Sequence, residues 1–222
     1  TRQIRTVMDC TAKQDADMLD KEVGRLLALS RRLGREDAAV TTPVIAAQAY
    51  YIIRDNDKSL LYCDRAIKES ESRTAYSVWK VALFQKAAIL VGNKRRKDAI
   101  GLYERVAAEA ARRGDVLYVL EGYRMSGFLN DELGKHEEAF IRFLLALEAG
   151  SHLDMSVRRT STFVYVASAA MRLCRKVRGK QDLEILESRL EQWLGTDWHE
   201  LTEAFGRQME PTRHKHSLFG RN

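Results

Sequence analysis

The sequence predicts an all-α protein built as an array of antiparallel helix pairs. Three observations lead to this prediction: an internal repeat of 40 residues, a long stretch without proline, and a composition rich in helix-forming residues. Both prolines, Pro43 and Pro211, lie toward the ends of the chain, and Ala, Leu, Arg and Glu are common between them. Such a composition favours continuous helices joined by short turns over strands.

The internal repeat is the most informative of the three, because residues of similar size and polarity recur every 40 positions. Ser59, Ala99 and Ala139 form the first of five such columns. In each repeat a bulky residue follows four positions later, and a small or β-branched one follows three positions after that. This spacing places all three on one side of a helix, which we interpret as the second helix of a pair. The other four columns are Cys63/Tyr103/Phe143, Ala66/Val106/Ala146, Ile67/Ala107/Leu147 and Ala47/Ala87/Gly127.

The third repeat predicts its own helix boundaries. Its first helix is expected from near Asp115 to near Leu133, and Gly134 then supplies a stop signal. The acidic pair that follows, Glu137 and Glu138, suits the start of a second helix, because the helix dipole favours negative charge there.

The flanks predict further helices, which we expect to act as degenerate or capping repeats. One amphipathic helix precedes the repeats, and a long helix is expected from about Met155 to Lys176, followed by a turn at Gly179. In all, about nine or ten helices are expected from patterns of this kind. The residues that mark the flanking helices are Met18, Leu19, Val23, Leu26, Leu27 and Leu33 before the repeats, and Leu183, Leu186, Leu190, Leu194, Trp193, Trp198, Leu201 and Phe205 after them.

The segment from Gly134 to Glu148 resembles the second half of a tetratricopeptide repeat. It has a turn glycine, an acidic pair, then alanine, a large aromatic residue and a second alanine at the intervals of that family. Tyr123 and Gly127 stand where the family's first helix carries tryptophan and glycine. The resemblance covers residues 40–150, with a period of 40 instead of about 34 and without the usual proline after the second helix. It implies a right-handed superhelix whose first helices line a concave, partner-binding surface.

The expected domain organisation is simple. We expect one helical-repeat domain over residues 1–210 and a mobile, basic tail over residues 211–222. The chain begins at Thr1 without an initiator methionine, which leaves open that it is a piece of a longer protein.

The resemblance places a candidate partner-binding groove on the first helices. The segment from Tyr76 to Val91 is apolar on nearly every side, so it is either wholly buried or exposes an apolar surface, and both interpretations stay open. Aromatic residues and methionine suit the binding of a helix or an extended peptide, while Arg124, Asp131 and Glu132 are expected to orient it. The candidate groove residues are Val44, Gln48, Tyr51, Val81, Phe84, Gln85, Arg124, Met125, Phe128, Asp131 and Tyr165.

The charge and the missing sequence motifs make some classes of function less favoured than protein binding. The net charge of +6 comes from 37 basic and 31 acidic residues that are mixed along most of the chain, so nucleic-acid binding is less favoured than protein binding. Lys94, Arg95, Arg96 and Lys97 form a secondary basic patch, for which a solvated turn is the alternative. No phosphate-binding loop, dinucleotide-binding glycine pattern or nucleophile elbow occurs, so no enzyme activity, catalytic residue, cofactor or metal is predicted.

We therefore expect a scaffold or adaptor module that recognises an apolar segment of a protein or peptide partner. Two alternatives are a ligand- or peptide-sensing regulatory domain of a larger bacterial signalling or transcription regulator, and a secretion-type chaperone. A homodimer is left open. The three cysteines form no CxxC pair and predict free thiols in a reducing, cytoplasmic setting. No apolar run of about 18 residues occurs, so membrane insertion is not expected.

Overall fold

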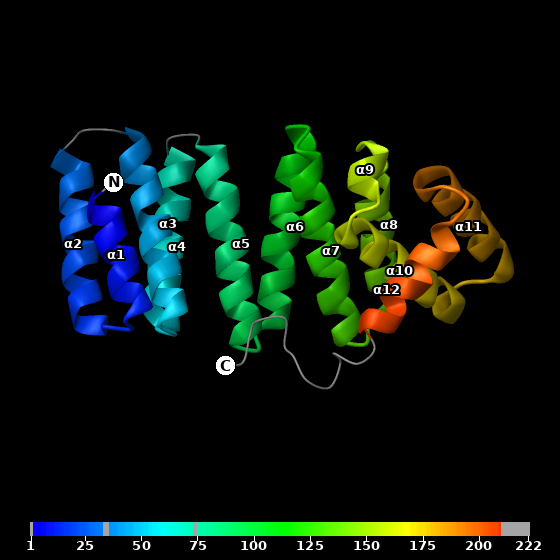
Figure 1. The fold of residues 1–222 in the computed structure, drawn as a ribbon, viewed down its shortest axis with the longest axis horizontal. Coiled ribbons are helices and arrows are strands. Elements are labelled where there is room, and N and C mark those ends of the chain that lie inside the picture. The colour runs from blue at the N-terminus through cyan, green and yellow to red at the C-terminus, as the bar shows by residue number, and fades with distance from the viewer. Residues whose placement is uncertain (1, 33–35, 73–74, 210–222) are drawn as a thin grey trace. The chain divides into compact units, whose positions relative to one another are not determined.

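A computed structural model describes residues 2–32, 36–72 and 75–209, and within these ranges the protein is entirely helical (Figure 1). Twelve helices and no strand occur in the described residues. The predicted fold class, an all-α array of helix pairs, is confirmed, whereas the expected number of nine or ten helices is too low. The predicted mobile tail, residues 211–222, lies outside the described residues.

The chain divides into two compact units, Thr1–Leu102 and Tyr103–Asn222. The boundary between them falls inside the sixth helix, α6 (Arg96–Arg112). The single domain expected over residues 1–210 stays a prediction.

The first unit is a series of helices that pack on their neighbours in the sequence. Its core is anchored by Tyr50, whose hydroxyl donates a hydrogen bond of 2.6 Å to Asp20 and whose ring stacks on Tyr62 at 5.4 Å between centroids. Tyr50 thereby joins its own helix, α3, to the helices before and after it, α2 and α4. The helices of the unit are α1 (Arg2–Ala12), α2 (Ala16–Arg32), α3 (Glu36–Ile52), α4 (Asn56–Ser72), α5 (Tyr76–Gly92) and the first part of α6.

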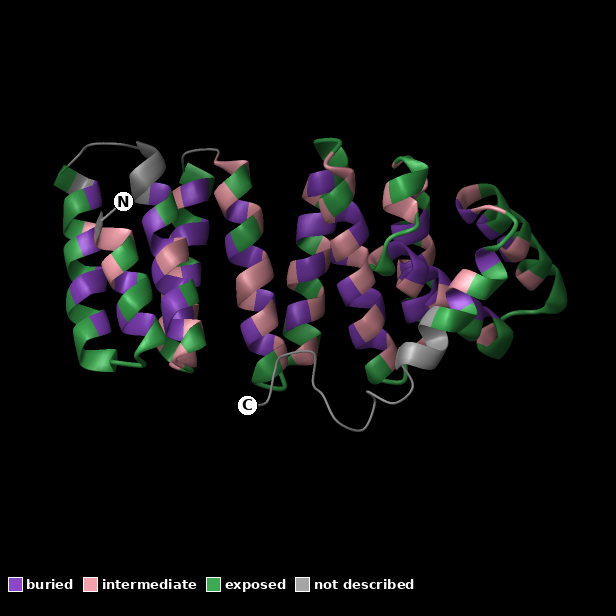
Figure 2. Cartoon of the chain, in the orientation of Figure 1, coloured by how far each residue is buried: buried purple, intermediate pink, exposed green. Residues whose placement is uncertain are grey.

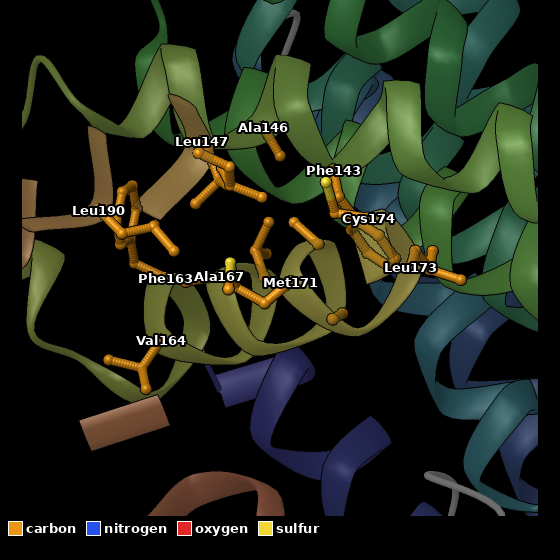
Figure 3. Close-up of a cluster of buried hydrophobic side chains, with 14 of the residues drawn as sticks. Phe143, Ala146, Leu147, Phe163, Val164, Ala167, Met171, Leu173, Cys174 and Leu190 are labelled. Carbon is orange, nitrogen blue, oxygen red and sulfur yellow. The ribbon is translucent and has the colours of Figure 1, made fainter. Parts of the chain in front are cut away.

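The second unit has a larger core, which fills the space between α8 and the helices that follow it (Figure 3). Phe143 and Leu147 of α8 point toward Ala167 and Met171 of α10, and Leu190 of α11 belongs to the same cluster. The helices of this unit are the rest of α6, α7 (Val116–Glu132), α8 (His136–Gly150), α9 (Met155–Arg158), α10 (Ser161–Val177), α11 (Lys180–Leu194) and α12 (Trp198–Met209).

The 40-residue columns of the sequence are columns of buried side chains. Ser59, Ala99 and Ala139 are completely buried, and the members of the other four columns are also buried (Figure 2). Helix boundaries follow the same step: α3, α5 and α7 begin at residues 36, 76 and 116, and α4, α6 and α8 begin at residues 56, 96 and 136. The repeat is therefore a repeat of packing positions.

The turn inside each pair is also repeated. Gln14, Arg54, Lys94 and Gly134 all have positive φ angles, between 55° and 75°, and they are 40 residues apart. In each turn the next residue donates its backbone N–H to a carbonyl five residues earlier, for example Lys135 to Asn130 at 2.9 Å. This is the hydrogen bond of a Schellman-type helix end. The first of these turns joins α1 to α2, so the array includes an N-terminal pair beyond the three repeats that the sequence indicated.

The prediction of a single helix from Met155 to Lys176 is wrong. Two helices occupy this stretch, and the chain leaves helical geometry at Arg159 and Thr160. At the break, the Arg159 guanidinium donates to the Leu194 carbonyl at 2.8 Å and to both carboxylate oxygens of Asp197. The break therefore lets one side chain hold the end of α11.

Two residues of the first unit lie in settings that the sequence pattern does not indicate. Pro43 lies inside α3 and is buried there, although a proline inside a helix lacks the N–H that would bond the preceding turn. Met18 is exposed, so it does not contribute to the apolar side of α2 as expected. Leu33, expected on the same side, lies outside the described residues.

Close approach between α6 and α7 predicts the effect of a single methyl group. A Cβ on Gly122 would lie 2.8 Å from the Tyr103 carbonyl oxygen and 2.9 Å from the Ala107 Cβ. Because a backbone atom cannot move aside cheaply, we expect Gly122→Ala to lower the free energy of unfolding by about 1–3 kcal/mol. Urea denaturation measures this change.

Gly101, which lies in α6, provides the control for this substitution, because a Cβ there would meet no atom within 4 Å. Gly101→Ala should raise the free energy of unfolding by about 0.5–1 kcal/mol, since alanine loses less backbone entropy in a helix. Equal effects of the two substitutions would contradict the close approach at Gly122.

Candidate partner-binding surface

The eleven predicted groove residues fall on five equivalent positions of the first helices, spaced by the 40-residue step. We call this set the first-helix face. Within the first unit it lies on α3 and α5, which are in contact, and within the second unit it lies on α7 and α10. The first unit contributes Val44, Gln48, Tyr51, Val81, Phe84 and Gln85, and the second contributes Arg124, Met125, Phe128, Asp131 and Tyr165.

The α3–α5 part of this face is uncharged and partly open to solvent. Val81 is 38% exposed and Gln48 is exposed, while Val44, Tyr51 and Phe84 are half-buried. Partial burial also raises the pKa of the Tyr51 hydroxyl. The α5 helix is therefore not wholly buried, which leaves an apolar surface that a partner can reach.

Gln85 is the polar exception on this part of the face. Its amide nitrogen is buried and has no hydrogen-bond partner within the described part of the chain. A buried donor without a partner costs about 1–3 kcal/mol, because it gives up its hydrogen bonds to water without replacement. Sequence patterns indicate where Gln85 lies, but they do not indicate that its donor is unsatisfied.

The second-unit part of the face differs, because its apolar members belong largely to the core. Met125 is buried, and Phe128 packs against the core cluster of this unit. Tyr165 meets the ring of Phe143 edge-on, at 6.3 Å between centroids. The structure thus places Met125, predicted as an anchor for a partner, in the interior.

The charged members of this part are held by intramolecular partners. Arg124 donates two hydrogen bonds to one oxygen of Glu121, at 2.9 and 2.6 Å. Asp131 accepts from Arg172 at 2.5 Å and lies 2.9 Å from the His136 ring nitrogen Nδ1. Both charges are therefore neutralised locally, and the orienting role expected for them would require these ion pairs to open.

Three arginines of the basic clusters also form ion pairs. In the predicted patch at the turn between α5 and α6, Arg95 forms an ion pair with Asp98 at 2.7 Å, while Lys94 and Lys97 are exposed. At the end of α10, Arg172 pairs with Asp131, and Arg178 lies 3.2 Å from Glu137. Pairing of this kind lowers the positive potential that a phosphate backbone would meet.

All three cysteines, Cys10, Cys63 and Cys174, are free and buried. Burial raises the pKa of each thiol, and it raises that of Cys63 to about 12. Thiols with raised pKa values are poor nucleophiles and poor metal ligands near neutral pH. These cysteines therefore act as small apolar core residues.

Metal-binding clusters and membrane-spanning helices are both absent from the described residues. In the described residues, no group of three or more His, Cys, Asp or Glu side chains is arranged to hold a metal ion. Across the same residues, no helix combines the length and the apolar character needed to cross a membrane.

Comparison of the chain with models of known protein families and with curated proteins finds no match.

The unsatisfied donor of Gln85 predicts a stabilising substitution. Gln85→Met keeps a similar shape and removes the buried N–H groups, so we expect the free energy of unfolding to rise by about 1 kcal/mol. Gln48→Met, at an exposed position of the same face, should change it by less than about 0.5 kcal/mol. Urea denaturation of both variants measures the difference, and destabilisation by Gln85→Met would show that the amide has a partner in solution.

The buried thiols predict slow chemical labelling. In the folded protein at pH 8, we expect Ellman's reagent to leave Cys63 unmodified, because the thiol is inaccessible and mostly protonated. All three thiols should react at once in denaturing urea. Rapid labelling of Cys63 under native conditions, located by peptide mass spectrometry, would contradict its placement in the core.

Proposed function

We propose that the chain is a tetratricopeptide-like module that binds an apolar segment of a partner protein through the α3–α5 part of the first-helix face. The observation that carries the proposal is an uncharged, partly exposed surface on two contacting helices, formed around Phe84 and Val81. An exposed apolar surface is costly unless it is covered in the working state of the protein.

The chemistry of this surface favours a peptide or helix as its occupant. An aromatic ring and β-branched side chains at successive helical turns offer apolar contacts. Recognition of a helix or an extended segment in a groove uses contacts of this kind.

A protein partner is favoured over nucleic acid by the state of the cations. A phosphate backbone would need to displace intramolecular partners from Arg95, Arg172 and Arg178. An apolar segment needs no such rearrangement. A catalytic role is not part of this proposal.

An adaptor, a secretion-type chaperone and a sensing domain of a larger bacterial regulator would all use this contact. These three roles differ only in what happens after the partner has bound. The same binding experiment therefore tests the contact on which all three depend.

The test compares proteins captured by three versions of the tagged chain from a lysate of its host, at about 150 mM salt. The versions are the wild type, the Val81→Glu/Phe84→Glu variant and the Leu61→Glu variant. Leu61 is a matched control, because it is 63% exposed on α4, outside the first-helix face. Circular dichroism and thermal unfolding check that each version is folded.

We expect one or more proteins to be retained by the wild type and by Leu61→Glu, and to be reduced at least about tenfold with the double variant, since central apolar contacts dominate such interfaces. Retention should persist at about 500 mM salt. Equal retention by all three versions would exclude this surface. Retention of nucleic acid that is lost at the higher salt would favour the basic clusters instead.

A further inference from the structure

A crevice of about 230 Å³ lies between α4, α5 and the start of α6, on a different side of the first unit from the first-helix face. Leucines form the apolar part of its lining, and two ion pairs form the charged part. Lys86 Nζ lies 2.5 Å from Asp64 Oδ1, and Arg95 lies 2.7 Å from Asp98 Oδ2. The lining residues are Leu60, Asp64, Lys86, Leu90, Arg95, Asp98 and Leu102.

Three residues of the second unit, 40 positions after Asp64, Lys86 and Leu102, show how the equivalent acid is paired there. Glu104 is the counterpart of Asp64, and it accepts a hydrogen bond of 2.7 Å from Ser126, the counterpart of Lys86. A second donor reaches the same carboxylate oxygen: the Arg142 Nε, at 2.5 Å. In the second unit an arginine from the next second helix therefore occupies the position beside the acid.

The two units differ at the counterpart of that arginine. Position 102 is leucine, so the first unit has no side chain there that can donate to Asp64. The Asp64 side chain is 57% exposed, against 30% for Glu104. Among the described residues, no hydrogen bond reaches Asp64 Oδ2 or Asp98 Oδ1. Two carboxylate oxygens on exposed side chains are thus left without a donor among the leucines of the lining.

We propose that this crevice binds an arginine side chain of a partner polypeptide, which takes the place that Arg142 holds in the second unit. The aliphatic part of an arginine suits the walls formed by Leu90 and Leu102, while its planar guanidinium has enough donors for both carboxylates. The space suits one side chain, because pockets for whole small molecules usually measure about 300–1,000 Å³.

This inference does not depend on the proposed function. The residues that carry it lie on α4, α6 and the opposite side of α5, and none belongs to the first-helix face. Loss of binding at one site therefore leaves the other untouched, so the two proposals fail separately.

The experiment uses the full chain with labelled leucine methyl groups and follows their NMR signals during titration with four blocked tripeptides. The peptides are acetyl-Gly-Xaa-Gly-amide, in which Xaa is arginine, lysine, citrulline or norleucine. Citrulline keeps the shape of arginine without its charge, and norleucine keeps only the apolar part. Ionic strength is held low, at about 20 mM, because exposed ion pairs are screened by salt.

We expect the arginine peptide to give saturable shifts at Leu90 and Leu102, with a dissociation constant on the order of 10 mM. The citrulline peptide should bind at least about fivefold more weakly, since charge-assisted hydrogen bonds are the stronger ones. Leu102→Arg should abolish the shifts at Leu90, because the new side chain fills the crevice from within, whereas Leu102→Met should keep them. Asp64→Asn should weaken binding of the arginine peptide by about the same factor as the change from arginine to citrulline. This variant replaces Leu102→Arg as the test if Leu102→Arg does not fold.

Three results would overturn the proposal. Equal binding of the norleucine peptide would show that the crevice takes an apolar side chain. Unchanged binding by Asp64→Asn and Leu102→Arg would place the arginine site elsewhere. Absence of saturable shifts at Leu90 and Leu102 would show that the crevice does not bind arginine.

Discussion

Close approach of paired helices through one column of small residues is the constraint on which the rest of each unit depends. Ala47 and Ala87 in the first unit, and Gly127 and Ala167 in the second, are buried at the same step of 40 residues. A Cβ on Gly127 would lie 2.8 Å from the Phe143 ring, so the bulky member of one column is seated against the small member of another. Because both columns must stay in register, helix lengths and turn lengths cannot drift between repeats.

The turns show how strongly this packing acts on the backbone. Glycine adopts the left-handed conformation at little cost, yet three of the four equivalent turns use Gln14, Arg54 and Lys94 there. The same Schellman-type hydrogen bond forms in all four. Since the local sequence does not favour this conformation at those three positions, the helices on either side impose it. The turn is thus a consequence of the packing columns, and its glycine is optional.

This dependence explains what the sequence could and could not predict. The first helix of the third repeat was expected from near Asp115 to near Leu133 and is found at Val116–Glu132, because buried columns and a glycine stop mark it together. Of the α1–α2 pair only α2 was expected, and the pair did not stand out as a repeat because larger residues such as Leu19 replace the small ones in its columns. The break at Arg159 depends on a distant partner, Asp197, which no local pattern reveals. Burial of Met125 likewise depends on tertiary neighbours.

The repeats also separate what holds the fold from what distinguishes one surface from another. Buried columns stay buried and uncharged from repeat to repeat even where residue size changes, as from Cys63 to Tyr103. Half-exposed columns change chemical type instead: Phe84 becomes Arg124, and Leu102 becomes Arg142. A change at such a position alters the surface at little cost to the core, because each helix pair is held mainly by its nearest neighbours. Glu104 accepts a hydrogen bond from Arg142 of its own chain, whereas its counterpart Asp64 keeps one carboxylate oxygen without a donor. This difference marks a position where a donor from another molecule can bind.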